Sequence, residues 1–189
     1  MTDDPDTEAD VDAGAGVDTD SDDNGDTSGP SGGYRHVVVD DLPNTPNPTR
    51  AKREVDEAVG ATEFGFNVFE ADPGERLPWG YHSHPEHEEL FYVVAGTVEV
   101  DTPEVTHRVE TGEAFFVPPN HPNRARAVGS EPARVLAVGA PKASDEAVVS
   151  EPCPNCGDET DRTHEVVDDG ETYVLSCAAC GGEADRFGG

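Results

Sequence analysis

The chain has 189 residues, and its 41 acidic against 12 basic residues give a formal net charge of −29 at neutral pH. So negative a surface disfavours nucleic acid and anionic membranes as partners, because neither offers a cationic surface to meet it. The apolar runs are shorter than the roughly 18 to 20 residues that a membrane-spanning helix needs. The N-terminus also lacks the basic start and apolar core of a signal peptide, so we expect a cytoplasmic protein.

The excess of acidic residues extends over the whole chain. Residues 1–33 hold eleven of the acidic residues and no basic one, which leaves 30 acidic against 12 basic residues in the remainder. Only two of the basic residues, Lys52 and Lys142, are lysines. At molar salt the Debye length falls to about 3 Å, and the self-repulsion of such a surface largely vanishes. The pattern therefore favours a halophilic protein from a saline cytoplasm over a chain that is merely acidic.

The first elements in chain order are irregular. Residues 1–33 contain too little apolar surface to offset the entropy of ordering, so they are predicted to form a disordered acidic tail. The pattern changes at Tyr34, after which residues 36–40 ("HVVVD") are predicted to be a short strand. Residues 42–49 are a loop punctuated by Pro and Asn, and residues 52–60 are either a short helix or a loop.

A series of short β-branched and aromatic runs follows, separated by Gly and Pro turns. The predicted strands lie at 62–71, 88–95, 97–100, 105–110, 114–119, 123–128 and 133–140. Regular spacing without a long helical period predicts an all-β antiparallel sandwich or barrel over residues 34–140. Residues 141–152 are interpreted as a linker, and residues 153–189 are too few to build a sufficient core without a staple.

The stretch "HSHPEHEEL" at 82–90 concentrates metal-ligating residue types. Residues i and i+2 of a strand face the same side about 7 Å apart, so His82 and His84 point into the same space if this segment is extended. On the returning strand Glu89 shares a face with Phe91 and Val93, and a glutamate in an apolar row is costly to bury without a cation. Two imidazoles and one carboxylate suit Fe, Mn, Ni, Cu or Zn.

These residues resemble the first motif of the cupin family, which is H-x-H, three or four residues, Glu, six residues and Gly. Here His82 and His84 are followed by four residues, Glu89, the six residues "LFYVVA" and Gly96. The six-residue count to Gly96 selects Glu89 over Glu88. The resemblance covers about residues 62–140. It implies a cupin-type antiparallel β-barrel, also called a double-stranded β-helix or jelly roll.

The second cupin motif is Gly, five residues, P-x-G, two residues, His, three residues and Asn. Its beginning is matched by Gly112, "EAFFV" and Pro118. The sequence then departs, because Asn120 takes the glycine slot and Asn123 takes the slot of the last metal-binding histidine. His121 lies two residues earlier, in a predicted turn that points it elsewhere.

The departure leaves two interpretations of the barrel site open. In the first, His82, His84 and Glu89 hold a divalent metal, which can be Fe, Mn, Ni, Cu or Zn, and Asn123 or water completes its shell. In the second, metal affinity is lost and the pocket binds a small molecule without metal.

Other residues near this motif receive interpretations of their own. His87 stands between acidic neighbours and is predicted to be solvent-exposed rather than a ligand. Trp79 and Tyr81 flank the histidines, where they line a pocket mouth or simply pack. Arg124 and Arg126 alternate with Asn123 along a strand, so we expect both arginines to face away from the barrel interior.

The resemblance also sets the expectations for function. Cupins oxidise, isomerise, epimerise or decarboxylate small metabolites, and others only bind a ligand. Lewis-acid polarisation or O₂ activation is the generic chemistry of such a metal. No acid–base group beside Glu89 is evident, so catalytic residues are not assigned. Two function classes stay open: a metal-dependent oxidoreductase or isomerase, and a non-catalytic sensor or adaptor with a degenerate site. Because cupin barrels commonly pair through their sheets, a homodimer is a candidate assembly.

The four cysteines form two matched knuckles, "CPNCG" and "CAACG", which contain Cys153, Cys156, Cys177 and Cys180. Paired C-x-x-C spacing with a glycine after each knuckle predicts a closed, structural four-cysteine zinc site. Residues between the knuckles form a plausible hairpin, and the segment resembles a zinc ribbon. Zinc binding contributes on the order of 10 kcal/mol of folding free energy, which supplies the missing staple. A redox C-x-x-C is the alternative, and the ribbon is expected to dock on the barrel or on a protein rather than on nucleic acid.

Overall fold

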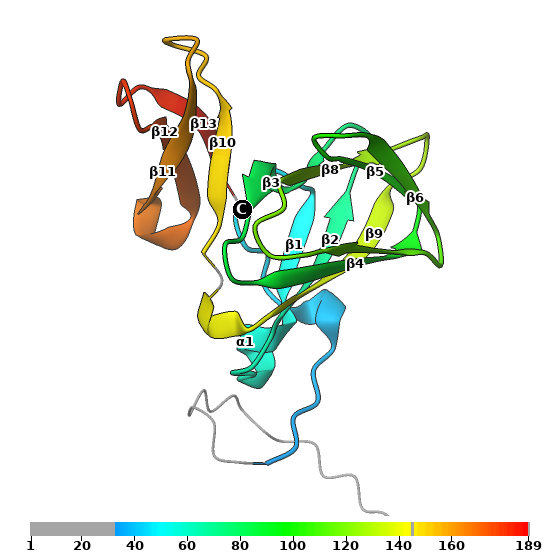
Figure 1. Ribbon diagram of the computed structural model, residues 1–189. Coiled ribbons are helices and arrows are strands. Elements are labelled where there is room, and N and C mark those ends of the chain that lie inside the picture. Colours follow the sequence, from blue (N-terminus) through cyan, green and yellow to red (C-terminus); the bar gives the residue numbers. More distant parts are fainter. Residues whose placement is uncertain (1–32, 145, 189) are drawn as a thin grey trace, which may run out of the picture.

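The computed structural model describes residues 33–144 and 146–188, which are mostly β-strand. Figure 1 shows a jelly roll of two facing sheets beside a smaller C-terminal group of strands. The predicted acidic tail lies outside the described residues except for Gly33. No helix in the described part of the chain is long and apolar enough to cross a membrane.

The first sheet has five antiparallel strands in the order β1-β2-β9-β4-β7. They are β1 (Ala51–Glu54), β2 (Gly65–Ala71), β9 (Ala133–Ala140), β4 (Glu88–Ala95) and β7 (Ala114–Val117). Strands β4 and β9 have the bounds that the sequence predicts, as does β8 (Asn123–Val128) of the second sheet. Strands β2 and β7 differ from the prediction by a few residues at one end, as do β5 (Thr97–Asp101) and β6 (Thr106–Glu110).

The second sheet has eight strands in the order β13-β12-β11-β10-β3-β8-β5-β6. Its jelly-roll half contains β3 (Arg76–Ser83), β8 (Asn123–Val128), β5 (Thr97–Asp101) and β6 (Thr106–Glu110). Its C-terminal half contains β10 (Val148–Pro152), β11 (Glu159–Val167), β12 (Thr172–Cys177) and β13 (Glu183–Gly188). Two antiparallel sheets connected in this way confirm the predicted all-β jelly-roll class.

The core lies between the two sheets and follows the two-residue period of the strands. In β4 and β9 every second residue is buried, so that Phe91, Val93 and Val135 face the interior. Val98 and Val100 of β5 face them from the other sheet and are fully buried. This apolar interior holds β3, β4 and β8 in place, and the candidate site lies at the ends of these strands.

Strand β8 shows the same alternation with opposite chemistry on its two faces. Asn123, Ala125 and Ala127 are buried, whereas the arginines between them point outward. Arg124 pairs with Asp101 at 3.0 Å, and Arg126 pairs with Glu99 at 2.8 Å. The prediction that both arginines face away from the interior is therefore confirmed.

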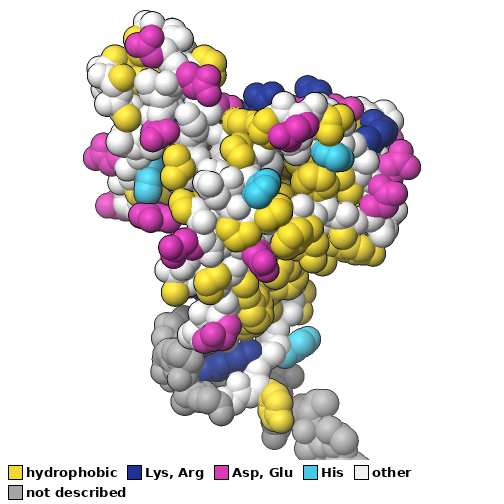
Figure 2. Space-filling view, in the orientation of Figure 1, with side chains coloured by type: hydrophobic (Ala, Val, Ile, Leu, Met, Phe, Trp, Pro, Cys, Tyr) yellow, Lys and Arg dark blue, Asp and Glu magenta, His cyan; other side chains and the backbone are white. Residues whose placement is uncertain are grey.

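The outer face of the first sheet is apolar along β4. Leu90, Tyr92 and Val94 alternate with the buried residues and are each about two-fifths exposed, and Phe116 of β7 is half exposed. Figure 2 shows the hydrophobic side chains gathered on this side of the jelly roll.

Two N-terminal expectations are decided by the structure. The predicted strand at 36–40 is wrong, because this segment leads into a 3-10 turn, η1 (Val39–Asp41), and pairs with none of the described strands. Because residues 36–40 pair with no described sheet edge, Val38 is left 56% exposed. Residues 52–60 were predicted to be either a short helix or a loop. They contain the end of β1 and a short helix, α1 (Val55–Val59).

The segment predicted as a linker, residues 141–152, contains a 3-10 turn, η2 (Lys142–Ser144), and strand β10. Strand β10 pairs with β3 through Val149 and His82 on one side. On the other side it pairs with β11 through residues 150–152. The C-terminal strands therefore continue the jelly-roll sheet through β10.

Lowering KCl from about 2 M to about 0.1 M at neutral pH is expected to loosen or unfold the protein. The Debye length then rises from about 2–3 Å to about 10 Å, so the acidic groups repel one another over longer distances. Far-ultraviolet circular dichroism across a KCl series measures the loss of strand signal, and NaCl at equal ionic strength should preserve it. An unchanged spectrum at low salt would contradict the halophilic interpretation.

Candidate metal centres and ligand pocket

The structure brings His82, His84 and Glu89 together at one end of the jelly roll. One ligand atom from each residue lies within 4.8 Å of the others, and all three side chains are buried. His82 Nε2 lies 3.9 Å from Glu89 Oε2. His82 Nδ1 lies 2.9 Å from the carbonyl oxygen of Gly80, a contact that fixes the ring orientation and turns Nε2 toward the cluster. These are the three residues that strand parity selects from "HSHPEHEEL".

Glu89 is a carboxylate in an apolar row of β4. Its neighbours across the sheet are Val117 on β7 and Gly139 on β9, and the side chain is only 11% exposed. Oε2 of Glu89 has no hydrogen-bond partner among the described residues. A buried carboxylate oxygen without a partner is costly, and a cation between two imidazoles removes that cost. The donor set of two nitrogens and one oxygen therefore fits a divalent transition metal.

Asn123 lies next to this cluster. It is the Cα partner of His82 in the β3–β8 ladder, so the two side chains share a face of the sheet. The Asn123 side chain is 1% exposed, and within the described chain neither its oxygen nor its nitrogen has a hydrogen-bond partner. The amide is thus a buried polar group on the same face of the sheet as His82.

The residues just before Asn123 follow the predicted turn. Asn120 has a φ of 58°, a left-handed conformation that explains why the motif has glycine at this position. His121 is exposed, and its Nδ1 lies 2.8 Å from the carbonyl oxygen of Pro119. His121 therefore does not take the place of the missing histidine in this structure.

The prediction of an exposed His87 is wrong. Its side chain is only 4% exposed, and its ring centroid lies 4.8 Å from that of His84. The ring covers Gly139, where a Cβ atom would lie 1.7 Å from His87 Nε2. Its Nδ1 lies 3.1 Å from the carbonyl oxygen of Pro141. The acidic neighbours Glu86 and Glu88 suggested solvent, but a glycine far along the chain makes room for the ring.

The four cysteine sulfurs also form one cluster. All lie within 4.8 Å of one another; Cys153 and Cys180 are 3.8 Å apart, and Cys156 and Cys177 are 3.9 Å apart. Sulfurs bound to one tetrahedral zinc lie about 3.8 Å apart, since each Zn–S bond is about 2.3 Å. No disulfide links the four residues. The cluster geometry therefore fits the predicted zinc site.

The two knuckles repeat one backbone arrangement. Gly157 and Gly181 have φ values of 81° and 69°, and their N–H groups donate to the carbonyl oxygens of Cys153 and Cys177. Hydrogen bonds from the Thr160 hydroxyl, at 3.0 Å, and from the Cys180 N–H lower the pKa of Cys177 to about 6. The predicted hairpin between the knuckles is present as β11 and β12. Thiolate is the form that zinc binds.

The match to known proteins agrees with the fold and with the first histidine motif. The family model described as Cupin domain matches residues 67–139. Protein SchB of Streptomyces halstedii is 36% identical over 106 residues, which cover 54% of this chain and 74% of SchB. The chain belongs to the cupin family.

One further protein is similar in sequence, and one solved structure is similar in fold. This cupin is 32% identical to the polyketide synthase CurC of Streptomyces cyaneus over 117 residues, which cover 62% of this chain and 70% of CurC. The solved structure of the polyketide cyclase RemF from Streptomyces resistomycificus shares the fold, with a TM-score of 0.50 and 24% identity. That comparison covers 60% of this chain and 83% of RemF.

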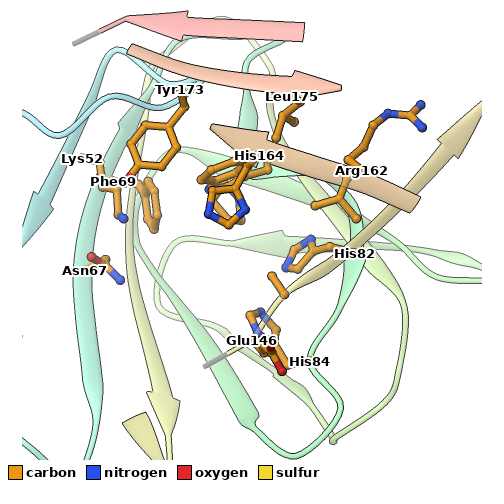
Figure 3. Close-up of a pocket in the computed structure, with 14 residues that line it drawn as sticks. Lys52, Asn67, Phe69, His82, His84, Glu146, Arg162, His164, Tyr173 and Leu175 are labelled. Atoms are coloured by element: carbon orange, nitrogen blue, oxygen red, sulfur yellow. The ribbon is translucent and has the colours of Figure 1, made fainter. Parts of the chain in front are cut away.

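A cavity of about 510 Å³ lies above the histidines of this cupin. His82, His84 and Trp79 line it, as do residues of β1, β2 and the C-terminal hairpin (Figure 3). Of the two aromatic residues expected at the pocket mouth, Trp79 lines the cavity, whereas Tyr81 is not among the lining residues. The volume falls within the range of small-molecule sites, about 300–1,000 Å³.

Proposed function

We propose that this cupin holds a divalent metal through His82, His84 and Glu89 and binds or transforms a small oxygen-bearing metabolite in the cavity above them. Asn123 or water completes the metal shell. The observation that carries the proposal is the Glu89 carboxylate, which is buried between two buried histidines and has an oxygen without a hydrogen-bond partner in the described chain. Because His82 and His84 also line the cavity, a ligand that enters it reaches the candidate metal site.

The chemistry follows from the donor set. A metal bound there supplies Lewis acidity that polarises a carbonyl or enol oxygen, or the capacity to activate O₂ if it is Fe or Cu. The chain's own residues orient the ligand. Asn67, which lines the cavity, offers a side-chain oxygen to a ligand hydroxyl, whereas the buried amide of Asn123 lies outside the cavity lining and is available to the metal alone.

The names of the relatives support a narrower substrate class. CurC is a polyketide synthase and RemF is a polyketide cyclase by name. A polyketide-like metabolite, with several carbonyl, enol or phenol oxygens, has the groups that a cation between two imidazoles and a carboxylate binds. We therefore place the ligand of this cupin in that chemical class.

A non-catalytic sensor or adaptor is the second candidate function. The observation that favours it is Asn123, which stands where the motif has its last histidine, so that three strong donors are present in place of four. Fewer donors weaken metal affinity, and the cavity would then bind its ligand without chemistry. The C-terminal strands would serve protein contacts in such a molecule.

Metal content separates the two functions. Protein purified in high salt is expected to carry two metal ions per chain by mass spectrometry. His82→Ala and Glu89→Ala should each remove one of them, because each leaves only two strong donors. Glu88→Ala is the matched control, since its side chain is exposed on the opposite face of β4. One zinc per chain, insensitive to the His82 and Glu89 changes and lost only on cysteine replacement, would support the sensor instead.

A further inference from the structure

The cavity lies between the jelly roll and the C-terminal strands, and both parts line it. From β11 and β12 come Arg162, His164, Tyr173 and Leu175. Figure 3 shows Tyr173 and His164 on the hairpin side, with His82 and His84 nearer the jelly roll. The hairpin that follows the first cysteine knuckle thus forms a wall opposite the candidate metal site.

This wall is aromatic. Trp79 lies edge-on to Tyr173, with ring centroids 5.1 Å apart, and to His164 at 6.3 Å. Phe69, which is buried, extends the aromatic lining toward β2. Ring faces and edges of this kind gain most from another flat ring, because offset-stacked and edge-to-face pairs add to the burial of apolar area.

The charged groups of the two cationic residues in the lining, Arg162 and Lys52, already have partners within the protein. Arg162 donates from its guanidinium to the carbonyl oxygens of Thr160, Glu151 and Pro152, and Figure 3 shows this group turned away from the cavity. Lys52 Nζ pairs with Glu54 at 2.7 Å. Asn67, by contrast, has a side-chain oxygen without a hydrogen-bond partner among the described residues. The lining therefore favours a neutral ligand that carries a hydroxyl donor over an anion.

The hairpin is held on the strand that carries His82. The carboxylate of Glu151 accepts a hydrogen bond of 3.0 Å from the Tyr81 N–H and covers Gly80, where a Cβ atom would lie 2.9 Å from it. Arg76 of β3 forms an ion pair with Asp185 of β13. The Phe187 ring packs 6.0 Å from that of Trp79. The C-terminal strands are thus tied to β3 through two strands, β10 and β13.

We propose that the β11–β12 hairpin is the ligand-recognition wall of the cavity and selects a flat, hydroxylated aromatic molecule. Tyr173, His164 and Trp79 contact its rings, Asn67 accepts a hydrogen bond from its hydroxyl, and another oxygen faces His82 and His84. The inference rests on the proposed function for the site and assigns to the C-terminal strands a part in ligand choice. The four-cysteine site then maintains the wall and takes no part in the chemistry.

Calorimetric titration with 2-naphthol tests the wall, with decahydro-2-naphthol as the saturated counterpart. The full chain in high salt is expected to bind 2-naphthol at least about tenfold more tightly than the saturated alcohol. Tyr173→Leu should weaken 2-naphthol binding by roughly 3- to 10-fold, the effect of losing one aromatic contact. Tyr173→Phe should keep the affinity, because the ring remains. Tyr92→Leu, an exposed tyrosine outside the cavity, is the matched control.

Two readouts on the same samples separate a recognition role from a folding defect. Trp79 is the only tryptophan, so its emission reports whether the wall is still packed in each variant. Metal content reports the barrel site independently. If protein without a metal at His82, His84 and Glu89 still prefers 2-naphthol, and if that preference depends on Tyr173, the recognition role of the hairpin is supported and the proposed metal site is contradicted. Three outcomes would contradict the recognition role of the hairpin. They are equal binding of the two alcohols, no binding of 2-naphthol, and a Tyr173→Leu variant that binds 2-naphthol like the native chain.

Discussion

Cys177→Ser is expected to unfold β11, β12 and β13 while the jelly roll stays folded. Cys177 is buried at the end of β12, and its sulfur lies 3.9 Å from that of Cys156 within the four-sulfur cluster. Zinc at the predicted four-cysteine site would contribute roughly 10–16 kcal/mol to folding, which is more than so small a group of strands can replace. The loss of one thiolate removes most of that contribution.

Hydrogen exchange read by mass spectrometry measures this result strand by strand. Amides of β11–β13 should exchange at rates near those of an unfolded chain, and amides of β4 and β9 should keep their protection. Ala178→Ser is the matched control, because Ala178 is exposed and directly follows Cys177 in the chain. Native protection of β12 in the Cys177→Ser variant would show that the hairpin stands without the metal.

Gly96→Ala should cost the jelly roll about 2–5 kcal/mol of unfolding free energy. Gly96 has a φ of 77°, a conformation that costs an L-residue about 1–2 kcal/mol. An added Cβ would also lie 2.6 Å from the carbonyl oxygen of Pro132 and 2.7 Å from the Cα of Ala133. Both atoms belong to the backbone at the start of β9, so overpacking adds a further penalty of about 1–3 kcal/mol.

Urea denaturation at constant high KCl measures the difference in stability. Gly112→Ala is the matched control, because Gly112 has a similar φ of 88° but no atom within 4 Å of an added Cβ. This control should lose only about 1–2 kcal/mol. Equal losses at the two glycines would mean that the contact with β9 contributes nothing and that only the backbone conformation matters.

Much of the jelly roll could be predicted because its strands are short and because β4, β5, β8 and β9 alternate buried with more exposed residues. The same parity places His82, His84 and Glu89 on inward faces, so their convergence follows from local pattern plus the six-residue count to Gly96. Burial of His87 could not be predicted, because it depends on Gly139, a residue of β9 that pairs directly with Glu89. The predicted strand at 36–40 has suitable residues, but strands also need a partner edge, which no local pattern reveals.

The cavity wall could not be predicted from the sequence either, because it too depends on contacts between segments far apart in the chain. Residues 141–152 have the composition of a connecting segment, yet β10 inserts between β3 and β11 and brings the hairpin to the cavity. The spacing of the four cysteines predicts a closed metal site but does not predict where that site lies in the fold. The position of the β11–β12 hairpin beside the histidines depends on contacts such as Trp79 with Tyr173, which join residues far apart in the chain.

Strand β10 also has a protective consequence for this cupin. It covers β3 at Ser83 and His82, where the backbone N–H and C=O groups would otherwise form an open sheet edge. Open edges invite pairing with strands of other molecules and lead to aggregation. A chain cut after β9 would expose this edge directly beside the histidines. The C-terminal strands are therefore an integral border of the sheet, and a shortened chain would need another cover at the same edge to stay in solution.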